Sequence, residues 1–195
     1  MHCRKEGMIF WLTGLSGAGK STIAEGVFDR LRTDRVDVAL LDGDTLRSGL
    51  HRDLGFSIKD RRENVRRAGA MAKEMAEDGK VVIAALISPI NEDRDRIRAS
   101  ALSRGLGYYE IFVNAPLAVC ELRDTKGLYR SSREGRLREL SGIDSPYEPP
   151  TDPELVLFTS IESAETSILY LYSKISLTIK SLRANTIQTF QSKNT

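Results

Sequence analysis

Several residue types and patterns are scarce in this chain, and each scarcity excludes a class of protein. The two cysteines, Cys3 and Cys120, form no CxxC pair and fit a reducing compartment. The two histidines, His2 and His51, are too few for an HExxH metalloprotease or a zinc finger. The longest uninterrupted apolar run, residues 81–87, is far too short to span a bilayer. We therefore expect a cytoplasmic protein.

Charge of one sign is also missing, because 29 Lys and Arg residues balance 27 Asp and Glu residues and leave a net charge of +2. This balance gives no overall attraction to nucleic acid or to a membrane, and we expect neither as a partner. The 195 residues, 41% of them hydrophobic, suit one globular domain, which we assign to residues 1–183. The polar residues 184–195 are expected to form a disordered tail.

Short apolar runs alternate with amphipathic stretches along the chain. The apolar runs predict five buried strands, at residues 8–13, 36–41, 81–86, 108–113 and 154–158. The amphipathic stretches predict helices after the first strand and at residues 60–78, 91–103 and 163–182. This alternation indicates a three-layer α/β/α fold around a mainly parallel, five-stranded sheet. In such folds ligands bind at the carboxyl ends of the strands.

A glycine-rich segment follows the first predicted strand and matches the pattern GxxxxGK[ST]. Its residues, with the one that follows, are Gly14, Leu15, Ser16, Gly17, Ala18, Gly19, Lys20, Ser21 and Thr22. Backbone N–H groups of such a loop surround phosphate oxygens, Lys20 reaches the β- and γ-phosphates, and the Ser21 hydroxyl binds Mg²⁺. The position between a strand and a helix supports this interpretation. The segment therefore predicts a site for ATP with Mg²⁺.

Carboxylates after the second predicted strand favour one class among nucleotide-binding proteins. No NKxD motif is present, which disfavours a GTPase, and no acidic residue ends the third strand, as it does in many ATPases. Asp42 and Asp44 instead follow the second strand, an arrangement that suits a kinase acting on a small molecule. Asp44 is a candidate to orient the acceptor hydroxyl, and Asp42 a candidate to support hydrated Mg²⁺. The alternative to this functional interpretation is an ordinary Asp-Gly turn with solvated carboxylates.

Motifs spread over residues 9–158 resemble the adenylyl-sulfate kinase family in order and spacing. They lie at residues 42–47, 54–57, 60–67, 87–89, 111–116, 120–124, 126–129 and 142–148. The resemblance implies a P-loop kinase fold with a basic lid. It also implies the reaction in which ATP phosphorylates the 3′-hydroxyl of adenylyl sulfate to give 3′-phosphoadenylyl sulfate and ADP, in sulfate activation.

The resemblance also implies which residues contact the acceptor nucleotide. They are Asp44, Arg47, Phe56, Arg61, Asn64, Ile87, Ser88, Lys126 and Leu140. Arg47 and Arg61 would supply forked donors to phosphate and sulfate oxygens, and Phe56 would stack on the adenine. For Arg62 and Arg66 we expect only a solvated helix face.

Ser88, in the motif at residues 87–89, corresponds to a position described in the family as a phosphoserine intermediate. No neighbour in sequence activates its hydroxyl, and direct in-line transfer needs no covalent intermediate. Since Ser before Pro is a common helix start, we expect Ser88 to cap a helix and to position the acceptor.

A dense basic stretch, at about residues 123–140, resembles the mobile lid of the family. Lys126 is the candidate for contact with the transferred phosphoryl group and Arg123 for the adenine side of ATP. Catalytic candidates are thus Lys20, Asp44, Ser88 and Lys126.

Leu140 departs from the family pattern, which has Phe at this position on the second face of the acceptor adenine. Leucine keeps apolar contact and removes one π face. The sequence therefore leaves open a related kinase acting on another nucleotide-linked small molecule and, less favoured, a non-catalytic nucleotide sensor. A homodimer and a functional link to an ATP sulfurylase also stay open.

Overall fold

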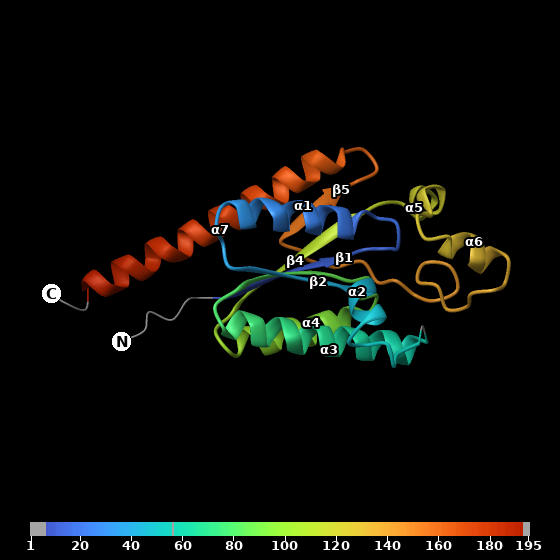
Figure 1. Ribbon diagram of the computed structural model, residues 1–195, viewed down its shortest axis with the longest axis horizontal. Coiled ribbons are helices and arrows are strands. Elements are labelled where there is room, and N and C mark those ends of the chain that lie inside the picture. Colours follow the sequence, from blue (N-terminus) through green and yellow to red (C-terminus); the bar gives the residue numbers. More distant parts are fainter. Residues whose placement is uncertain (1–6, 56, 193–195) are drawn as a thin grey trace.

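The protein is described by a computed structural model that covers residues 7–55 and 57–192, with side chains as far as residue 182. A five-stranded sheet lies between two layers of helices (Figure 1). Its strands are β1 (Met8–Thr13), β2 (Val38–Asp42), β3 (Val81–Ala85), β4 (Gly107–Asn114) and β5 (Leu155–Phe158). They are arranged in the order β2-β3-β1-β4-β5, and every neighbouring pair is parallel. The predicted fold class is confirmed.

Two helices cover each face of the sheet. The structure contains α1 (Lys20–Thr33), α2 (Gly43–Ser48), α3 (Ile58–Glu77), α4 (Asn91–Leu102), α5 (Leu117–Arg123), α6 (Leu128–Arg133) and α7 (Ala164–Ser192). In Figure 1, α1 and α7 lie on one face, and α3 and α4 lie on the other. The short helices α2, α5 and α6 gather at the end of the molecule where the strands terminate. Among the described residues, no helix has both the length and the apolar character needed to cross a bilayer.

Strand β1 contributes to the cores on both sides of the sheet, because its alternate side chains point to opposite faces. Phe10 and Leu12 pack in the apolar cluster beneath α1 and α7, whereas Ile9 and Trp11 pack in the cluster beneath α3 and α4. All four side chains are fully buried. A central strand buried on both faces explains why the first apolar run shows no alternation with polar residues.

The structure differs from the sequence-based predictions at two helix ends. α4 begins at Asn91 with Ile90 as its N-cap, so the expectation that Ser88 caps this helix is wrong. The Asn91 N–H is satisfied instead by the carboxylate of Glu148, at 2.7 Å. α7 continues to Ser192, beyond the expected end at Leu182. No proline or glycine interrupts the chain there to end the helix.

Candidate active site

A cavity of about 550 Å³ opens at the carboxyl ends of β1, β2 and β3. It brings together nearly all of the residues that the sequence singled out. Its lining includes Ser16, Gly17, Ala18, Gly19, Lys20, Ser21, Thr22, Asp42, Asp44, Arg47, Arg61, Asn64, Ile87, Ser88, Arg123, Lys126 and Leu140. Gly14 and Leu15 lie just outside it, and Phe56, the expected adenine platform, is outside the described residues.

The glycine-rich loop adopts backbone conformations that side chains would prevent. Gly14 has a φ of 155°, and a Cβ atom there would lie 2.4 Å from the carbonyl oxygen of Val113. Gly17 has a φ of 75°, in the left-handed region that favours glycine. Helix α1 then begins at Lys20, so its first N–H groups and the positive end of its dipole face the cavity. This arrangement is a ready-made site for phosphate oxygens.

Lys20 is held within the loop itself. Its ammonium donates to the carbonyl oxygens of Gly14, at 2.9 Å, and Leu15, at 2.8 Å. The side chain is 9% exposed, and this burial lowers the pKa of Lys20 to about 8. The charge of the nearby Lys126 contributes to this lowering, and Asp44 opposes it. Lys20 is thus a poorly solvated cation beside the expected phosphate positions.

Ser21 and Asp42 meet across the start of α1 and the end of β2. The Ser21 hydroxyl donates to Asp42 Oδ2 at 2.7 Å. The other carboxylate oxygen of Asp42 accepts the backbone N–H groups of Asp44, at 3.0 Å, and Thr45, at 3.1 Å, and so caps α2. A hydroxyl and a carboxylate oxygen are hard ligands of the type that Mg²⁺ prefers. Among the described residues, no cluster of three or more His, Cys, Asp or Glu side chains is placed to hold a metal.

An ion pair joins the lid to the end of β2. The Lys126 ammonium contacts Asp44 Oδ2, although the two residues are far apart in the sequence. Lys126 lies between α5 and α6, in the segment that the sequence identified as a lid. The contact places one cation and one carboxylate side by side on the wall of the cavity.

Helix α3 supplies the polar groups on the side of the cavity opposite the loop. Arg61 and Asn64, one turn apart, are both buried, at 7% and 4% exposed. Burial lowers the pKa of Arg61, and the neighbouring Arg47 lowers it further. Asn64 Oδ1 lies 2.7 Å from Nδ1 of His51, a buried residue that the sequence analysis did not select. A lone histidine between two motifs carries no spacing signal by which it could have been found.

The lid is anchored to the phosphate loop at two points. Arg123 donates to the carbonyl oxygen of Gly17 at 3.2 Å and to both oxygens of Thr159, a residue after β5 that sequence reasoning missed. The Tyr129 hydroxyl, on α6, donates to the Ser16 carbonyl oxygen at 2.9 Å. The basic segment is therefore attached to the loop that it was expected to cover.

Leu140 and Ser88 border the cavity but have little surface in it. Leu140 is 1% exposed and belongs to the apolar cluster that contains Ala18 and Tyr129. Ser88 is also 1% exposed, and its hydroxyl accepts a hydrogen bond from the Trp11 indole at 3.0 Å. Arg62 and Arg66 pair with the carboxylates of Asp93 and Glu63, outside the cavity.

The parallel sheet, the phosphate loop after β1 and the polar cavity beside it define a P-loop kinase of the class that acts on small molecules. Comparison with known proteins specifies the family. The residue pattern that describes the family "Adenylylsulphate kinase" matches residues 6–158, and the chain belongs to this family.

Individual relatives agree with this family. The chain is 50% identical over 161 residues to an adenylyl-sulfate kinase of Geotalea daltonii. The aligned residues make up 83% of this chain and 78% of the relative. It is 52% identical over 159 residues to an adenylyl-sulfate kinase of Bacillus pumilus, covering 82% and 80%. The solved structure of Mycobacterium tuberculosis APS kinase CysC in complex with AMPPNP and APS superimposes with a TM-score of 0.84 at 40% identity. That match covers 88% of this chain and 98% of the other.

Proposed function

We propose that this protein transfers the γ-phosphoryl group of ATP to the 3′-hydroxyl of adenylyl sulfate. Family membership and a solved relative with AMPPNP and APS support this reaction. The observation that carries the proposal is the single cavity that joins the phosphate loop to Asp44, Arg61 and Asn64. A donor triphosphate and an anionic acceptor nucleotide would meet in this cavity.

The donor side is built to stabilise charge on a transferring phosphoryl group. Lys20 and the first N–H groups of α1 would hold the β- and γ-phosphates, because both face the cavity. Lys126 would approach the same group from the lid, and closure of the lid would exclude water. Arg123 would lie on the adenine side of ATP, since it already contacts Gly17 and Thr159.

Ser21 and Asp42 would hold Mg²⁺ on the donor side. Their oxygens are 2.7 Å apart, where the end of β2 meets the start of α1, next to the expected phosphate positions. The ion, when bound with ATP, would neutralise charge on the β- and γ-phosphates.

The acceptor side supplies orientation rather than a covalent intermediate. Asp44 would accept the hydrogen bond of the 3′-hydroxyl and hold it in line with the γ-phosphorus. Arg47 and Arg61 would bind the phosphosulfate, Asn64 would add a neutral hydrogen bond, and Phe56 would stack on the adenine. The buried Ser88 hydroxyl, already engaged by Trp11, supports direct transfer over a phosphoserine.

The partners that the proposal implies are small molecules. The acceptor would come from a reaction that joins sulfate to the AMP moiety of ATP, the chemistry of an ATP sulfurylase.

The test is a product assay with purified protein, Mg²⁺, ATP and adenylyl sulfate, in which ADP and 3′-phosphoadenylyl sulfate are separated chromatographically. We expect both products in equal amounts. Lys20→Ala should lower turnover by about 10²–10³-fold, because one charge-stabilising donor is lost. Asp44→Asn should lower turnover while the KM for ATP stays the same.

Parallel assays with other nucleotides in place of adenylyl sulfate test the acceptor. Absence of product from adenylyl sulfate, with ready phosphorylation of another nucleotide, would overturn the proposed acceptor and leave the kinase class intact. Absence of turnover with every acceptor would overturn the enzymatic proposal.

A further inference from the structure

The loop between β3 and α4 has an unusual backbone conformation at Ser88. Its φ is +39°, in the left-handed region that residues other than glycine rarely adopt. Such a conformation persists only where surrounding contacts impose it. Because Ile87 and Ser88 line the cavity, whatever holds this loop also shapes the wall of the acceptor site.

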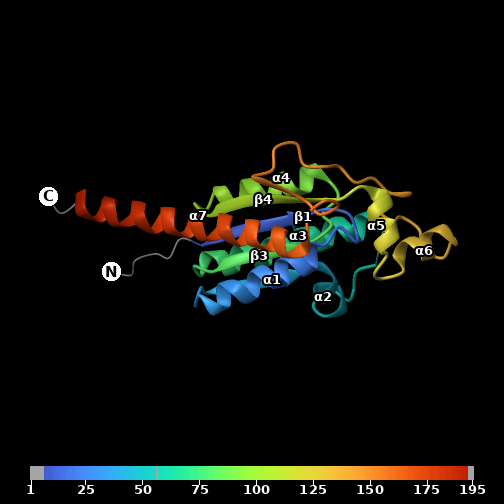
Figure 2. The same cartoon turned by 90° about the horizontal axis from the view of Figure 1, so that it is seen from above.

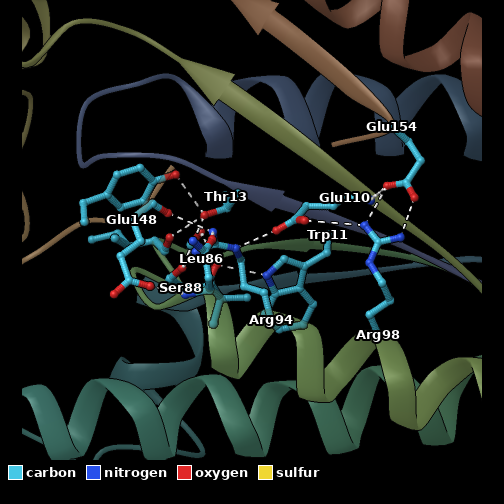
Figure 3. A network of polar contacts seen from close by, with 12 residues as sticks. Trp11, Thr13, Leu86, Ser88, Arg94, Arg98, Glu110, Glu148 and Glu154 are labelled. Atoms are coloured by element: carbon cyan, nitrogen blue, oxygen red, sulfur yellow. Dashed lines mark hydrogen bonds and ion pairs between the residues drawn. The ribbon is translucent and has the colours of Figure 1, made fainter. Parts of the chain in front are cut away.

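Two side chains of β1 hold the loop from one side. The Trp11 indole N–H donates to Ser88 Oγ at 3.0 Å, and the Thr13 hydroxyl donates to the Ile87 carbonyl oxygen at 2.7 Å (Figure 3). These contacts come from the neighbouring strand in the centre of the sheet.

Arg94, on α4, holds the same loop from the other side. It is 1% exposed, and its guanidinium donates to three separate segments of the chain. Nη1 donates to the Ser88 carbonyl oxygen at 2.5 Å, Nη2 to the Glu148 carbonyl oxygen at 2.8 Å, and Nε to Glu110 Oε1 at 2.6 Å. Figure 3 shows Arg94 at the centre of these contacts.

The charge of Arg94 is balanced by the buried carboxylate of Glu110 on β4. Glu110 is shared with Arg98, whose Nη2 lies 3.5 Å from Glu110 Oε2 and which also pairs with Glu154. Arg94 and Arg98 are therefore neighbours in one ion-pair network, one helical turn apart. They differ in burial, since the Arg98 side chain is 26% exposed, and in reach: besides Glu110, Arg94 bonds the Ser88 loop, whereas the hydrogen bonds of Arg98 reach Glu110 and Glu154.

Glu148 extends the connection to the segment that follows Leu140. Its backbone N–H donates to the Pro89 carbonyl oxygen at 2.8 Å, and its carboxylate accepts the N–H of Asn91. With the contact from Arg94 to the Glu148 carbonyl, the Ser88 loop of the cavity wall is joined to the segment that follows Leu140, itself a lining residue.

We propose that Arg94 is a positioning residue for the acceptor site, and that it acts by fixing the Ser88 loop and the segment around Glu148 relative to each other. The inference rests on the proposed function. A planar guanidinium is required, because only a fork of several N–H donors reaches Ser88, Glu148 and Glu110 together. A lysine keeps the charge opposite Glu110 but, as a single ammonium, does not span all three.

The experiment compares Arg94→Lys with the matched control Arg98→Lys. Both variants keep the charge in the same network on the same helix. We expect Arg94→Lys to raise the KM for adenylyl sulfate by about tenfold, because the loss of one hydrogen bond from a charged donor changes affinity by about that factor. The KM for ATP should not change. Arg98→Lys should leave both KM values unchanged. Melting temperatures of both variants show how far each is destabilised.

A second readout does not depend on turnover. Trp11 is the only tryptophan in the chain and donates directly to Ser88, so its fluorescence reports the loop. Arg94→Lys should shift the emission maximum of Trp11, and Arg98→Lys should not. Thr13→Val removes the hydrogen bond to the Ile87 carbonyl oxygen without removing a charge and should raise the acceptor KM in the same direction.

Several outcomes would overturn the inference. Equal effects of the two lysine variants would mean that the network acts only through stability. An equal rise of both KM values in Arg94→Lys would mean that the loop does not serve the acceptor. An unshifted Trp11 emission would mean that Arg94 does not hold the loop. If the wild type fails to phosphorylate adenylyl sulfate, the proposed function is overturned, and Trp11 emission alone decides whether Arg94 holds the loop.

Discussion

Lys20 must remain charged while its side chain is shielded from water. Burial lowers its pKa to about 8, so that a substantial part of the ammonium groups is neutral a little above neutral pH. A triphosphate beside it favours the charged form. ATP binding and protonation of Lys20 are therefore linked.

From this linkage we expect the affinity for ATP to fall as the pH rises through about 8. Above that pH each binding event must return a proton to Lys20, which costs up to about tenfold in affinity per pH unit. Calorimetric titration with ATP between about pH 7 and 9.5, in buffers of different ionisation enthalpy, measures both affinity and proton uptake. A pH-independent affinity without proton uptake would contradict this expectation.

The packing around Leu140 determines what effect a substitution at this position has. From the sequence, a phenylalanine there would restore a stacking surface for the acceptor adenine. In the structure Leu140 is 1% exposed and packs within the apolar cluster beneath α1 and α7, so a larger ring would crowd its apolar neighbours.

Leu140→Phe should therefore destabilise the protein by about 1–3 kcal/mol through overpacking, without improving the affinity for the acceptor. For a chain of this length, each kcal/mol corresponds to about 2–4 °C in melting temperature. Leu140→Met, which nearly conserves volume, is the control and should cost less than about 1.5 kcal/mol. A gain in acceptor affinity at an unchanged melting temperature would show that the pocket is open at this position.

At the scale of elements, α2, α5 and α6 were missed by the sequence analysis. Each has at most seven residues, too few to show a helical period. They depend on capping and on contacts from elsewhere: Asp42 caps α2, and the Asp124 carboxylate accepts two N–H groups at the start of α6. Since these helices carry or flank Asp44, Arg123 and Lys126, the ends of elements shape the site.

The two functions assigned to Asp42 can be separated by substitution. Asp42→Asn keeps an oxygen that accepts the N–H groups of Asp44 and Thr45 but loses the charge next to Ser21. We expect an unchanged melting temperature and a higher Mg²⁺ concentration for half-maximal activity at fixed ATP. Asp42→Ala should show the same Mg²⁺ effect and also lose about 0.5–2 kcal/mol of stability with the cap. Equal Mg²⁺ dependence in wild type and Asp42→Asn would contradict a role in metal binding.

At the scale of the whole molecule, α7 packs beside α1 on one face of the sheet and then projects beyond the body of the sheet (Figures 1 and 2). Ile168, Leu171, Ile175 and Ile179 pack into the core on this face. The approach is close, since a Cβ atom at Gly26 would lie 2.5 Å from Ile168 Cδ1. The first half of α7 is therefore part of the core.

A chain that ends at Leu182 should accordingly retain the melting temperature and the KM values of the full chain. Leu182 still packs against the core, whereas the end of α7 projects beyond the sheet (Figures 1 and 2). A chain that ends at Ser163 should fail to fold, because the apolar surface of α1 would be exposed. Thermal melts and circular dichroism of both shortened chains test this, and a marked loss of stability in the chain ending at Leu182 would contradict it.

The sequence by itself determined the class of protein. A buried strand, a glycine-rich loop and a helix follow one another within residues 8–33, so local patterns were enough to predict a phosphate site and a parallel α/β fold. Motifs along residues 9–158 also identified the family, which the comparisons confirm.

Tertiary structure alone decided how the site residues are paired and which of them are exposed. The ion pair of Lys126 with Asp44, the contact of His51 with Asn64, and the hydrogen bond from Arg94 to the Ser88 carbonyl join segments that no local period relates. The burial of Leu140 depends in the same way on what packs around it. These contacts arise from the close packing of separate elements, so they exist only when the sheet and its helices are assembled.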